Sequence, residues 1–341
     1  MQLGTPASIA FGHLRIGISS YCNLRCKHCY VHEDYRDQDK GLLEQSQLSV
    51  DEITNFVDHL IEKYSLRKVS LSGGEPLLNV VFPRSAAVIA HANRRGLEVQ
   101  LNTGGLGEVE IRDVVSMFDD PQKLVLRFSF DGANRETVDH FCGRAGVYRS
   151  ALRQMFEAVH CGALVQARIT INRHNIGEAL DAYRLLSSIG IDAFRVKPIF
   201  ASAVALDSED ALLVSIDDIR VLQEAMIRMA AETSTRLELP PPILVDTSKP
   251  RPNVKYAECD CGIASVFLSI NGDLYPCPHV IGDPGSAEYF VGNVRRSGFD
   301  LETAWRTSPA VQRCQAINGC ANCPSQLTLL KNVHKRALAC A

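Results

Sequence analysis

The sequence predicts an α/β protein in which a partial (β/α)6 barrel of the TIM type precedes a small cysteine-rich domain of a β-hairpin and helices. Strand-like alternation recurs six times with helix-like patterns between, and strand–helix alternation of this kind builds a parallel sheet. Six units are fewer than the eight of a closed TIM barrel, which favours an open or partial barrel. Seven of the twelve cysteines then fall within residues 259–341, where the character of the sequence changes.

The strand-like segments follow one another through the first two hundred residues. They are residues 14–19, 68–72, 97–102, 124–130, 165–172 and 193–199. Helical patterns lie at 50–64, 84–95, 134–140, 147–161, 177–189 and 217–233. The clearest begins at Val50, because Ser49 and Glu52 form a capping-box pattern ahead of an apolar face. In folds of this kind the reactive residues follow the carboxyl ends of the strands.

A proline-rich stretch marks the predicted domain boundary. Residues 239–253 contain five prolines, which is typical of a stiff, extended connector. We therefore expect a lead-in over 1–13, a barrel with its following helix over 14–238, a linker over 239–254 and a cysteine-rich domain over 255–341. Within the last of these, "SINGDLYPC" predicts a hairpin with an Asn-Gly turn.

Charge and hydropathy exclude several classes of protein. The formal net charge is −3, so no basic field indicates nucleic acid or an anionic membrane as a partner. The chain has no apolar run of about 18 residues or more, and its first residues lack the pattern of a signal peptide. We therefore expect a cytoplasmic protein. In a reducing compartment, twelve cysteines favour metal or redox chemistry over disulfides.

Three of these cysteines lie together directly after the first predicted strand. They are Cys22, Cys26 and Cys29. A structural zinc site normally uses four protein ligands, and a [4Fe-4S] cluster takes one ligand per iron. Three thiolates in one loop would leave one iron open for a substrate or cofactor. The alternative is a zinc knuckle completed by His28, His32 or a distant cysteine.

The order of the motifs resembles the radical S-adenosylmethionine (radical SAM) superfamily. The Cys-x3-Cys-x2-Cys loop is followed by Tyr30, and "SLSGGEP" at 70–76 ends the second strand as the family's Gly-Gly-Glu-Pro motif does. "SFDG" at 129–132 ends the fourth strand and matches the family's ribose-contacting region. "LNTGG" at 101–105 ends the third, where relatives often carry a Thr-Asn-Gly-like turn. The resemblance covers residues 14 to about 200.

This resemblance implies a reaction. A [4Fe-4S] cluster on Cys22, Cys26 and Cys29 would bind S-adenosylmethionine through its open iron. One electron would cleave the cofactor to a 5′-deoxyadenosyl radical, which abstracts hydrogen from the substrate. An electron donor such as flavodoxin or ferredoxin is an expected partner. No single residue stands out as the catalytic acid or base.

The resemblance also implies contacts with S-adenosylmethionine. Gly73 and Gly74 would let the backbone approach its methionine moiety, and Glu75 would bind the methionine ammonium. Arg168 would reach the carboxylate, with an ion pair within the sheet as the alternative. The full expected set is His28, Gly73, Gly74, Glu75, Asn102, Ser129, Asp131 and Arg168.

The C-terminal cysteines resemble the SPASM or twitch extension of radical SAM enzymes, which binds auxiliary iron–sulfur clusters. The spacing from Gly272 to Cys277, the "GN" at 292–293 and Trp305 carry this resemblance. One [4Fe-4S] cluster would use Cys259 or Cys261 with Cys277, Cys320 and Cys323. Two clusters would use all seven cysteines, with Cys314 and Cys340 as further ligands and one position filled by another group. Cys142 and Cys161 are expected to be core or helix residues instead.

Two classes of substrate fit these motifs. The leading hypothesis is an oxidoreductase that matures a ribosomally made peptide by crosslinking, epimerisation or oxidation. Only 21 residues precede Cys22, so a leader-binding domain is not expected here, and a separate leader-peptide-binding protein is a candidate partner. The alternative is a small-molecule enzyme such as a twitch-type dehydrogenase. A non-catalytic iron–sulfur or zinc protein is a more distant alternative.

Overall fold

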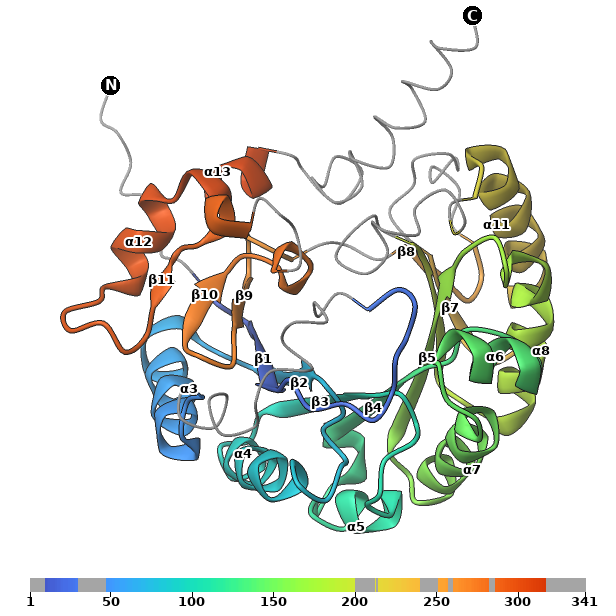
Figure 1. The fold of residues 1–341 in the computed structure, drawn as a ribbon, viewed down its shortest axis with the longest axis horizontal. Helices are drawn as coiled ribbons and strands as arrows, with labels where there is room; N and C mark the ends of the chain where they lie inside the picture. The colour runs from blue at the N-terminus through green and yellow to red at the C-terminus, as the bar shows by residue number, and fades with distance from the viewer. Residues whose placement is uncertain are drawn as a thin grey trace, which may run out of the picture.

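Strands β1 to β8 lie side by side in chain order and are parallel throughout (Figure 1). They belong to a computed structural model that describes residues 10–29, 47–199, 212, 214–239, 251–256, 260–281 and 286–316. The strands are β1 His13–Ser19, β2 Lys68–Gly73, β3 Glu98–Thr103, β4 Leu124–Ser129, β5 Leu164–Ile171, β6 Ala193–Pro198, β7 Arg236–Leu239 and β8 Val254–Tyr256. The six predicted strands are confirmed, and β7 and β8 are additions that the sequence reading missed.

Helices cover the outer face of this curved sheet (Figure 1). They are α3 Val50–Tyr64, α4 Phe82–Arg94, α5 Ile111–Val115, α6 Arg135–Phe141, α7 Val147–His160, α8 Ala179–Ile189 and α11 Ile216–Ala230. The predicted capping box of α3 is present, because Ser49 Oγ accepts from Glu52 N and Glu52 Oε2 accepts from Ser49 N. All six predicted helices are confirmed, and α5 was not predicted.

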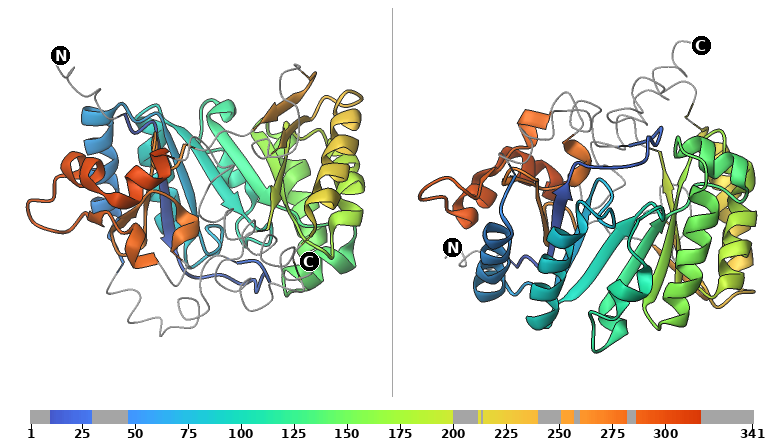
Figure 2. Two further views of the ribbon diagram at one scale, coloured as in Figure 1. Left: turned by 90° about the horizontal axis from the view of Figure 1, so that it is seen from above. Right: turned by 60° about the horizontal axis from the view of Figure 1, so that its bottom comes forward.

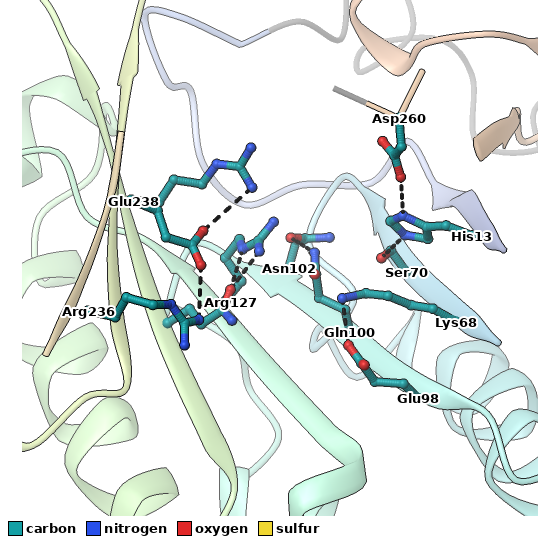
Figure 3. Close-up of polar contacts among 12 residues, drawn as sticks. His13, Lys68, Ser70, Glu98, Gln100, Asn102, Arg127, Arg236, Glu238 and Asp260 are labelled. Carbon is teal, nitrogen blue, oxygen red and sulfur yellow. Dashed lines mark hydrogen bonds and ion pairs between the residues drawn. The ribbon is translucent and has the colours of Figure 1, made fainter. Parts of the chain in front are cut away.

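The two faces of the sheet differ in chemistry. On β1, Leu14, Ile16 and Ile18 are fully buried, while His13 and Arg15 alternate with them. Because side chains alternate across a strand, apolar residues face the helices and polar residues face the interior of the partial barrel. We call this interior the lumen; Lys68, Ser70, Gln100, Asn102 and Arg127 line it in Figure 3. The polar side chains that line the lumen suit contact with hydrophilic ligands.

The C-terminal region continues the same sheet beyond β1. Strand β9 (Ser265–Leu268) pairs in parallel with β1, β10 (Asp273–Tyr275) pairs antiparallel with β9, and β11 (Gly292–Asn293) pairs antiparallel with β10. The predicted Asn-Gly hairpin is thus confirmed; its Gly272 has φ 94°, a left-handed conformation that favours glycine. The α/β barrel with a C-terminal antiparallel hairpin is the fold that the sequence predicts.

Helices α12 (Leu301–Thr307) and α13 (Pro309–Ala316) lie on the same side of the molecule as α3 (Figure 2). The Trp305 side chain is 1% exposed and packs edge-on against Phe11, with ring centroids 4.8 Å apart. This packing and the shared sheet join the C-terminal region to the barrel, while the boundary at residues 239–254 stays a prediction. Four short 3-10 helices complete the described elements: η1 Pro121–Lys123, η2 Ile176–Glu178, η3 Pro278–Val280 and η4 Ser286–Tyr289. Among the described helices, none is long and apolar enough to cross a membrane.

Candidate active site

The Gly-Gly-Glu-Pro turn packs directly against the backbone that leads from β1 to the cysteines. Gly74 N donates to Ser19 O and Glu75 N to Tyr21 O, both at 2.7 Å. A Cβ placed at Gly74 would lie 1.8 Å from Tyr21 O, and one at Gly73, where φ is 120°, would lie 2.3 Å from Ser19 O. We expected these glycines to admit the methionine moiety of the cofactor. In the structure they also admit the backbone that leads into the cysteine loop, so they set where that loop starts, and their approach to the cofactor stays a prediction.

The cysteine loop is also held on its opposite side. Arg25 N donates to Cys142 O at 2.9 Å and Lys27 N to Phe141 O at 3.1 Å, just after α6. Leu24 is 3% exposed and anchors the loop in the core. Backbone contacts on both sides therefore place the three cysteines at the carboxyl ends of the strands, the position expected for reactive residues.

The donor set of the loop fits an iron–sulfur cluster. Burial, together with the charges of Glu75, Cys26 and Cys29, raises the pKa of the Cys22 thiol to about 12. Among the described residues, no three His, Cys, Asp or Glu side chains already converge as they would around a bound metal ion. The fit therefore rests on three thiols in one fixed loop, and iron binding would have to displace the Cys22 proton.

Glu75 ties the ends of β2 and β3 together. Its carboxyl group is 1% exposed and accepts from Leu77 N at 3.1 Å, Thr103 Oγ1 at 2.8 Å and Gly104 N at 2.8 Å. Burial raises its pKa, and these three hydrogen bonds oppose the increase. Most of the accepting capacity of Glu75 is thus used within the protein, and its contact with a methionine ammonium stays a prediction.

Thr103 is the residue of β3 that bonds to Glu75, while the expected contact of Asn102 with the cofactor stays a prediction. Asn102 Nδ2 donates to Leu71 O and its Oδ1 accepts from Gln100 Nε2, both at 2.9 Å, so this amide is engaged within the sheet. Sequence reasoning missed Thr103, although it lies in the same "LNTGG" segment. The family's Thr-Asn-Gly-like turn pointed instead to Asn102, the residue directly before Thr103.

The remaining predicted cofactor residues meet around the carboxyl end of β4, where Ser129 is the strand neighbour of Arg168 on β5. Ser129 Oγ accepts from Arg168 Nη2 at 2.9 Å, and Asp131 Oδ2 lies 3.9 Å from His28 Nε2. His28 stacks on Phe141 with ring centroids 4.8 Å apart. Burial lowers the pKa of His28, as do the charges of Arg168 and Lys197, while Asp131 opposes them. We call this group, with the cysteine loop and the Gly73–Glu75 turn, the rim.

Several buried polar atoms of the rim have no hydrogen-bond partner in the described part of the chain. They include His28 Nδ1, Asp131 Oδ2 and Arg168 Nε. Arg168 forms no ion pair with a described carboxylate, which argues against the alternative that it serves only as an ion pair within the sheet. Because buried polar groups are normally satisfied, three such atoms around one place fit a polar ligand there.

Three of the C-terminal cysteines lie close together. Cys261 and Cys277 are buried in one small cluster with Val280. Cys314 packs against Gly262, the residue after Cys261, because a Cβ placed at Gly262 would lie 2.6 Å from the Cβ of Cys314. The other four predicted ligands, Cys259, Cys320, Cys323 and Cys340, lie outside the described residues. Cys142 is buried at the end of α6 and Cys161 is exposed at the end of α7, the kinds of position expected for them.

A polar link between the cysteine-rich region and the lumen was missed by the sequence reading. His13 Nδ1 lies 3.1 Å from Asp260 Oδ2, and its Nε2 lies 2.6 Å from Ser70 Oγ (Figure 3). Arg15 also forms an ion pair with Asp260, the residue before Cys261. The available signal was the alternation of His13 and Arg15 with apolar residues on one strand.

A second such link joins β6 to η3. Lys197 Nζ lies 2.6 Å from His279 Nε2. Burial lowers the pKa of His279 well below its usual value, and the charge of Lys197 adds to this effect. The C-terminal region thus contributes side chains to the polar interior of the barrel.

This fold and rim define a radical SAM protein. Residues 16–197 match the model of the Radical SAM superfamily, which is more than half of the chain. The chain therefore belongs to that superfamily, and membership implies a [4Fe-4S] cluster and S-adenosylmethionine.

Curated relatives share part of their length with this chain. Fe-coproporphyrin III synthase of Methanosarcina barkeri is 30% identical over 165 residues, which cover 48% of this chain and 38% of that protein. The subtilosin biosynthesis protein AlbA of Bacillus subtilis is 23% identical over 183 residues, or 53% of this chain and 38% of AlbA. The chain spans less than half the length of the curated relatives it matches.

Solved structures share the fold more fully. Streptococcus suis SuiB bound to the precursor peptide SuiA superposes with a TM-score of 0.69 at 14% identity, over 92% of this chain and 70% of SuiB. The enzyme anSMEcpe with bound AdoMet gives a TM-score of 0.57 at 15% identity, over 88% of this chain and 82% of that one. At these identities the likeness shows the fold.

Proposed function

We propose that this radical SAM enzyme matures a ribosomally made peptide by crosslinking, epimerisation or oxidation. The main support is the likeness to SuiB, a protein solved with its precursor peptide, over 92% of this chain. A second support is that the curated relatives include AlbA, which is named as a protein of bacteriocin biosynthesis. A separate leader-peptide-binding protein and an electron donor such as flavodoxin or ferredoxin remain proposed partners.

In this proposal the rim holds the cofactors. Cys22, Cys26 and Cys29 bind the [4Fe-4S] cluster, and when bound the cluster and S-adenosylmethionine supply the electron and the radical that start the reaction. The rim's own contribution is to orient the cofactor. His28, Ser129, Asp131 and Arg168 offer the buried polar atoms that a ligand would satisfy, and Glu75 fixes the turn that positions the loop.

The C-terminal region, residues 255–341, is proposed to carry at least one auxiliary [4Fe-4S] cluster. The support is the close packing of Cys261, Cys277 and Cys314. Cys259, Cys320, Cys323 and Cys340 complete the proposed ligand set for one or two clusters. The contact between Cys314 and Gly262 favours placing Cys314 in the same site as Cys261.

The first experiment tests the radical chemistry. Anaerobically reconstituted protein, reduced with dithionite, should convert S-adenosylmethionine to 5′-deoxyadenosine and methionine. Cys26→Ala should abolish this conversion, while Cys161→Ala, at an exposed helix end, should not change it. Full turnover by Cys26→Ala would contradict the assignment of the loop.

The second experiment tests the substrate. Short peptides encoded beside the gene are incubated with the reduced enzyme in D2O and examined by mass spectrometry. A loss of two mass units indicates crosslinking or oxidation, and incorporation of one deuterium indicates epimerisation. Unchanged peptides, in reactions that still make 5′-deoxyadenosine, would contradict the peptide proposal.

A small-molecule substrate is the second candidate. Its support is the set of curated relatives that includes Fe-coproporphyrin III synthase and AdoMet-dependent heme synthase, both of Methanosarcina barkeri. Stimulation of 5′-deoxyadenosine formation by a tetrapyrrole and by no peptide would favour this candidate over the first.

A further inference from the structure

Three arginines surround one carboxylate on the β4–β7 side of the lumen. Arg236 Nη2 lies 3.0 Å from Glu238 Oε1, and Arg195 Nη1 lies 3.9 Å from Glu238 Oε2. Arg127, on β4, points toward the same place (Figure 3). The pKa of Glu238 is lowered by Arg195, Arg236 and Arg127, which outweigh the opposing effect of burial. Although the formal net charge of the chain is −3, this wall of the lumen is cationic.

Arg127 is the least compensated of the three. Its Nε and Nη2 atoms donate to the neutral amide oxygen Gln166 Oε1, at 3.0 and 2.6 Å, and it forms no ion pair with any described carboxylate. Burial, together with the charges of Arg195, Arg168 and Arg15, lowers the pKa of Arg127 to about 9, although the charge of Glu238 opposes this decrease. Buried charges in proteins are normally paired with an opposite charge. The Arg127 guanidinium therefore lacks a paired anion among the described residues.

The position of this group matches a substrate site. Arg127 lies two residues before Ser129 on β4, and Arg195 is the strand neighbour of Arg168 on β5. A ligand bound here would therefore lie directly beside the proposed S-adenosylmethionine site at the rim, about 7 Å further into the lumen along β4. Gln100 and Asn102 face the same space from β3 (Figure 3).

We propose that Arg127 and Arg195 bind a carboxylate of the substrate inside the lumen. Guanidinium groups suit this ligand because their planar donors match the two oxygens of a carboxylate. The inference rests on the proposed function in one respect, that the substrate occupies the lumen. The carboxylate is an acidic side chain if the substrate is a peptide, or an acid group of a small molecule in the second candidate.

Binding to matched neutral and acidic probes tests this site. The reconstituted holoenzyme is titrated anaerobically by calorimetry with N-acetyl-Glu-Glu-amide, with its Gln-Gln counterpart and with propane-1,2,3-tricarboxylate. We expect an acidic probe to bind, and binding to fall at least about tenfold in Arg127→Gln and in Arg195→Gln, since each loses a charge-assisted contact. Arg153→Gln, which changes an exposed arginine on α7, should bind as the wild type does.

The outcomes distinguish a peptide carboxylate from the acid group of a small molecule, and they show which results would contradict the site. Arginine-dependent binding of the dipeptide supports a peptide carboxylate, and the same dependence for the tricarboxylate alone supports a small acid. Measurable binding that is equal for the acidic and neutral dipeptides, no binding of either acidic probe at 10 mM, or unchanged binding in both arginine variants would overturn the proposal.

Two further readouts separate this site from the proposed function and from a structural role. Substrate-free cleavage of S-adenosylmethionine, measured in parallel, reports on the rim, so failure there is distinct from failure of the lumen site. The melting temperature of Arg127→Gln should equal or exceed that of the wild type, because the substitution removes repulsion between cations. A fall as large as that of Glu238→Gln would assign Arg127 to structure and overturn the proposal.

Discussion

The rim and the lumen are built by different means. At the rim, backbone approaches backbone: Gly74 N and Glu75 N bind the carbonyl groups of Ser19 and Tyr21, with no room for a side chain at Gly74. In the lumen, long side chains from neighbouring strands interact, as Arg127, Arg195 and Arg236 do around Glu238. The rim should therefore fail abruptly when its geometry changes, whereas the lumen should respond in steps as charges are removed.

The largest expected effect is at Gly74. In Gly74→Ala the new Cβ would lie 1.8 Å from the carbonyl oxygen of Tyr21, so the cysteine loop must shift. We expect loss of most of the iron bound by this loop and loss of S-adenosylmethionine cleavage, measured by iron analysis and by 5′-deoxyadenosine yield. Gly177→Ala is the control, because nothing lies within 4 Å of a Cβ there. Normal cleavage by Gly74→Ala would show that the rim tolerates movement.

Removing the Glu238 carboxylate should lower the stability of the protein, whereas removing the Arg127 cation should not. Glu238→Gln leaves Arg195 and Arg236 without the carboxylate that they share and removes the negative charge nearby that favours Arg127, so the free energy of unfolding should fall by about 3 kcal/mol. Denaturant unfolding measures this loss. Equal stability of Glu238→Gln and the wild type would mean that other groups neutralise the arginines.

The hydrogen bond from Thr103 tests the rim without adding bulk. Thr103→Val keeps the shape but leaves one oxygen of buried Glu75 and the amide of Gly105 with fewer partners. Unfolding free energy should fall by about 1–3 kcal/mol. S-adenosylmethionine cleavage should decrease more than for Thr54→Val, a change at a half-buried position of α3. Equal cleavage by the two variants would contradict a link from Thr103 to the loop.

The pH dependence of stability should report the lumen carboxylate. The folded-state pKa of Glu238 lies below its unfolded value of 4.5, so its contribution is present above pH 4.5 and is lost as the pH falls below it. Between pH 6 and pH 3 the wild type should lose more stability than Glu238→Gln does. Parallel pH profiles for the two proteins would show that Glu238 does not titrate differently on folding.

The smallest effect is expected at the surface. Arg295 makes ion-pair contacts with Glu52 at 2.6 and 2.8 Å, which join the turn after β11 to the start of α3. This pair lowers the pKa of Glu52 to about 2, but it is exposed, so Arg295→Gln should cost only about 0.5 kcal/mol. High salt should remove the difference. A loss above about 2 kcal/mol would mean that the C-terminal region depends on this contact.

Local signals in the sequence determined the order and type of most elements. The capping box at Ser49 and Glu52, the strand alternation and the Asn-Gly turn each act within a few residues, and each was found in the structure. The same signals placed the cysteine loop, Glu75 and Ser129 at the ends of their strands. Strands β7 and β8 were missed because each is four residues or shorter and lies beside the proline-rich stretch.

Only the tertiary structure decided which of these residues meet. The approach of Gly74 to Tyr21, the hydrogen bonds of Glu75 to Thr103 and the contact of Cys314 with Gly262 join segments separated along the chain. Such pairs depend on strand register and on the curvature of the sheet, which no local pattern encodes. The cationic wall of the lumen has the same origin, because Arg127, Arg195 and Glu238 become neighbours only when β4 to β7 align.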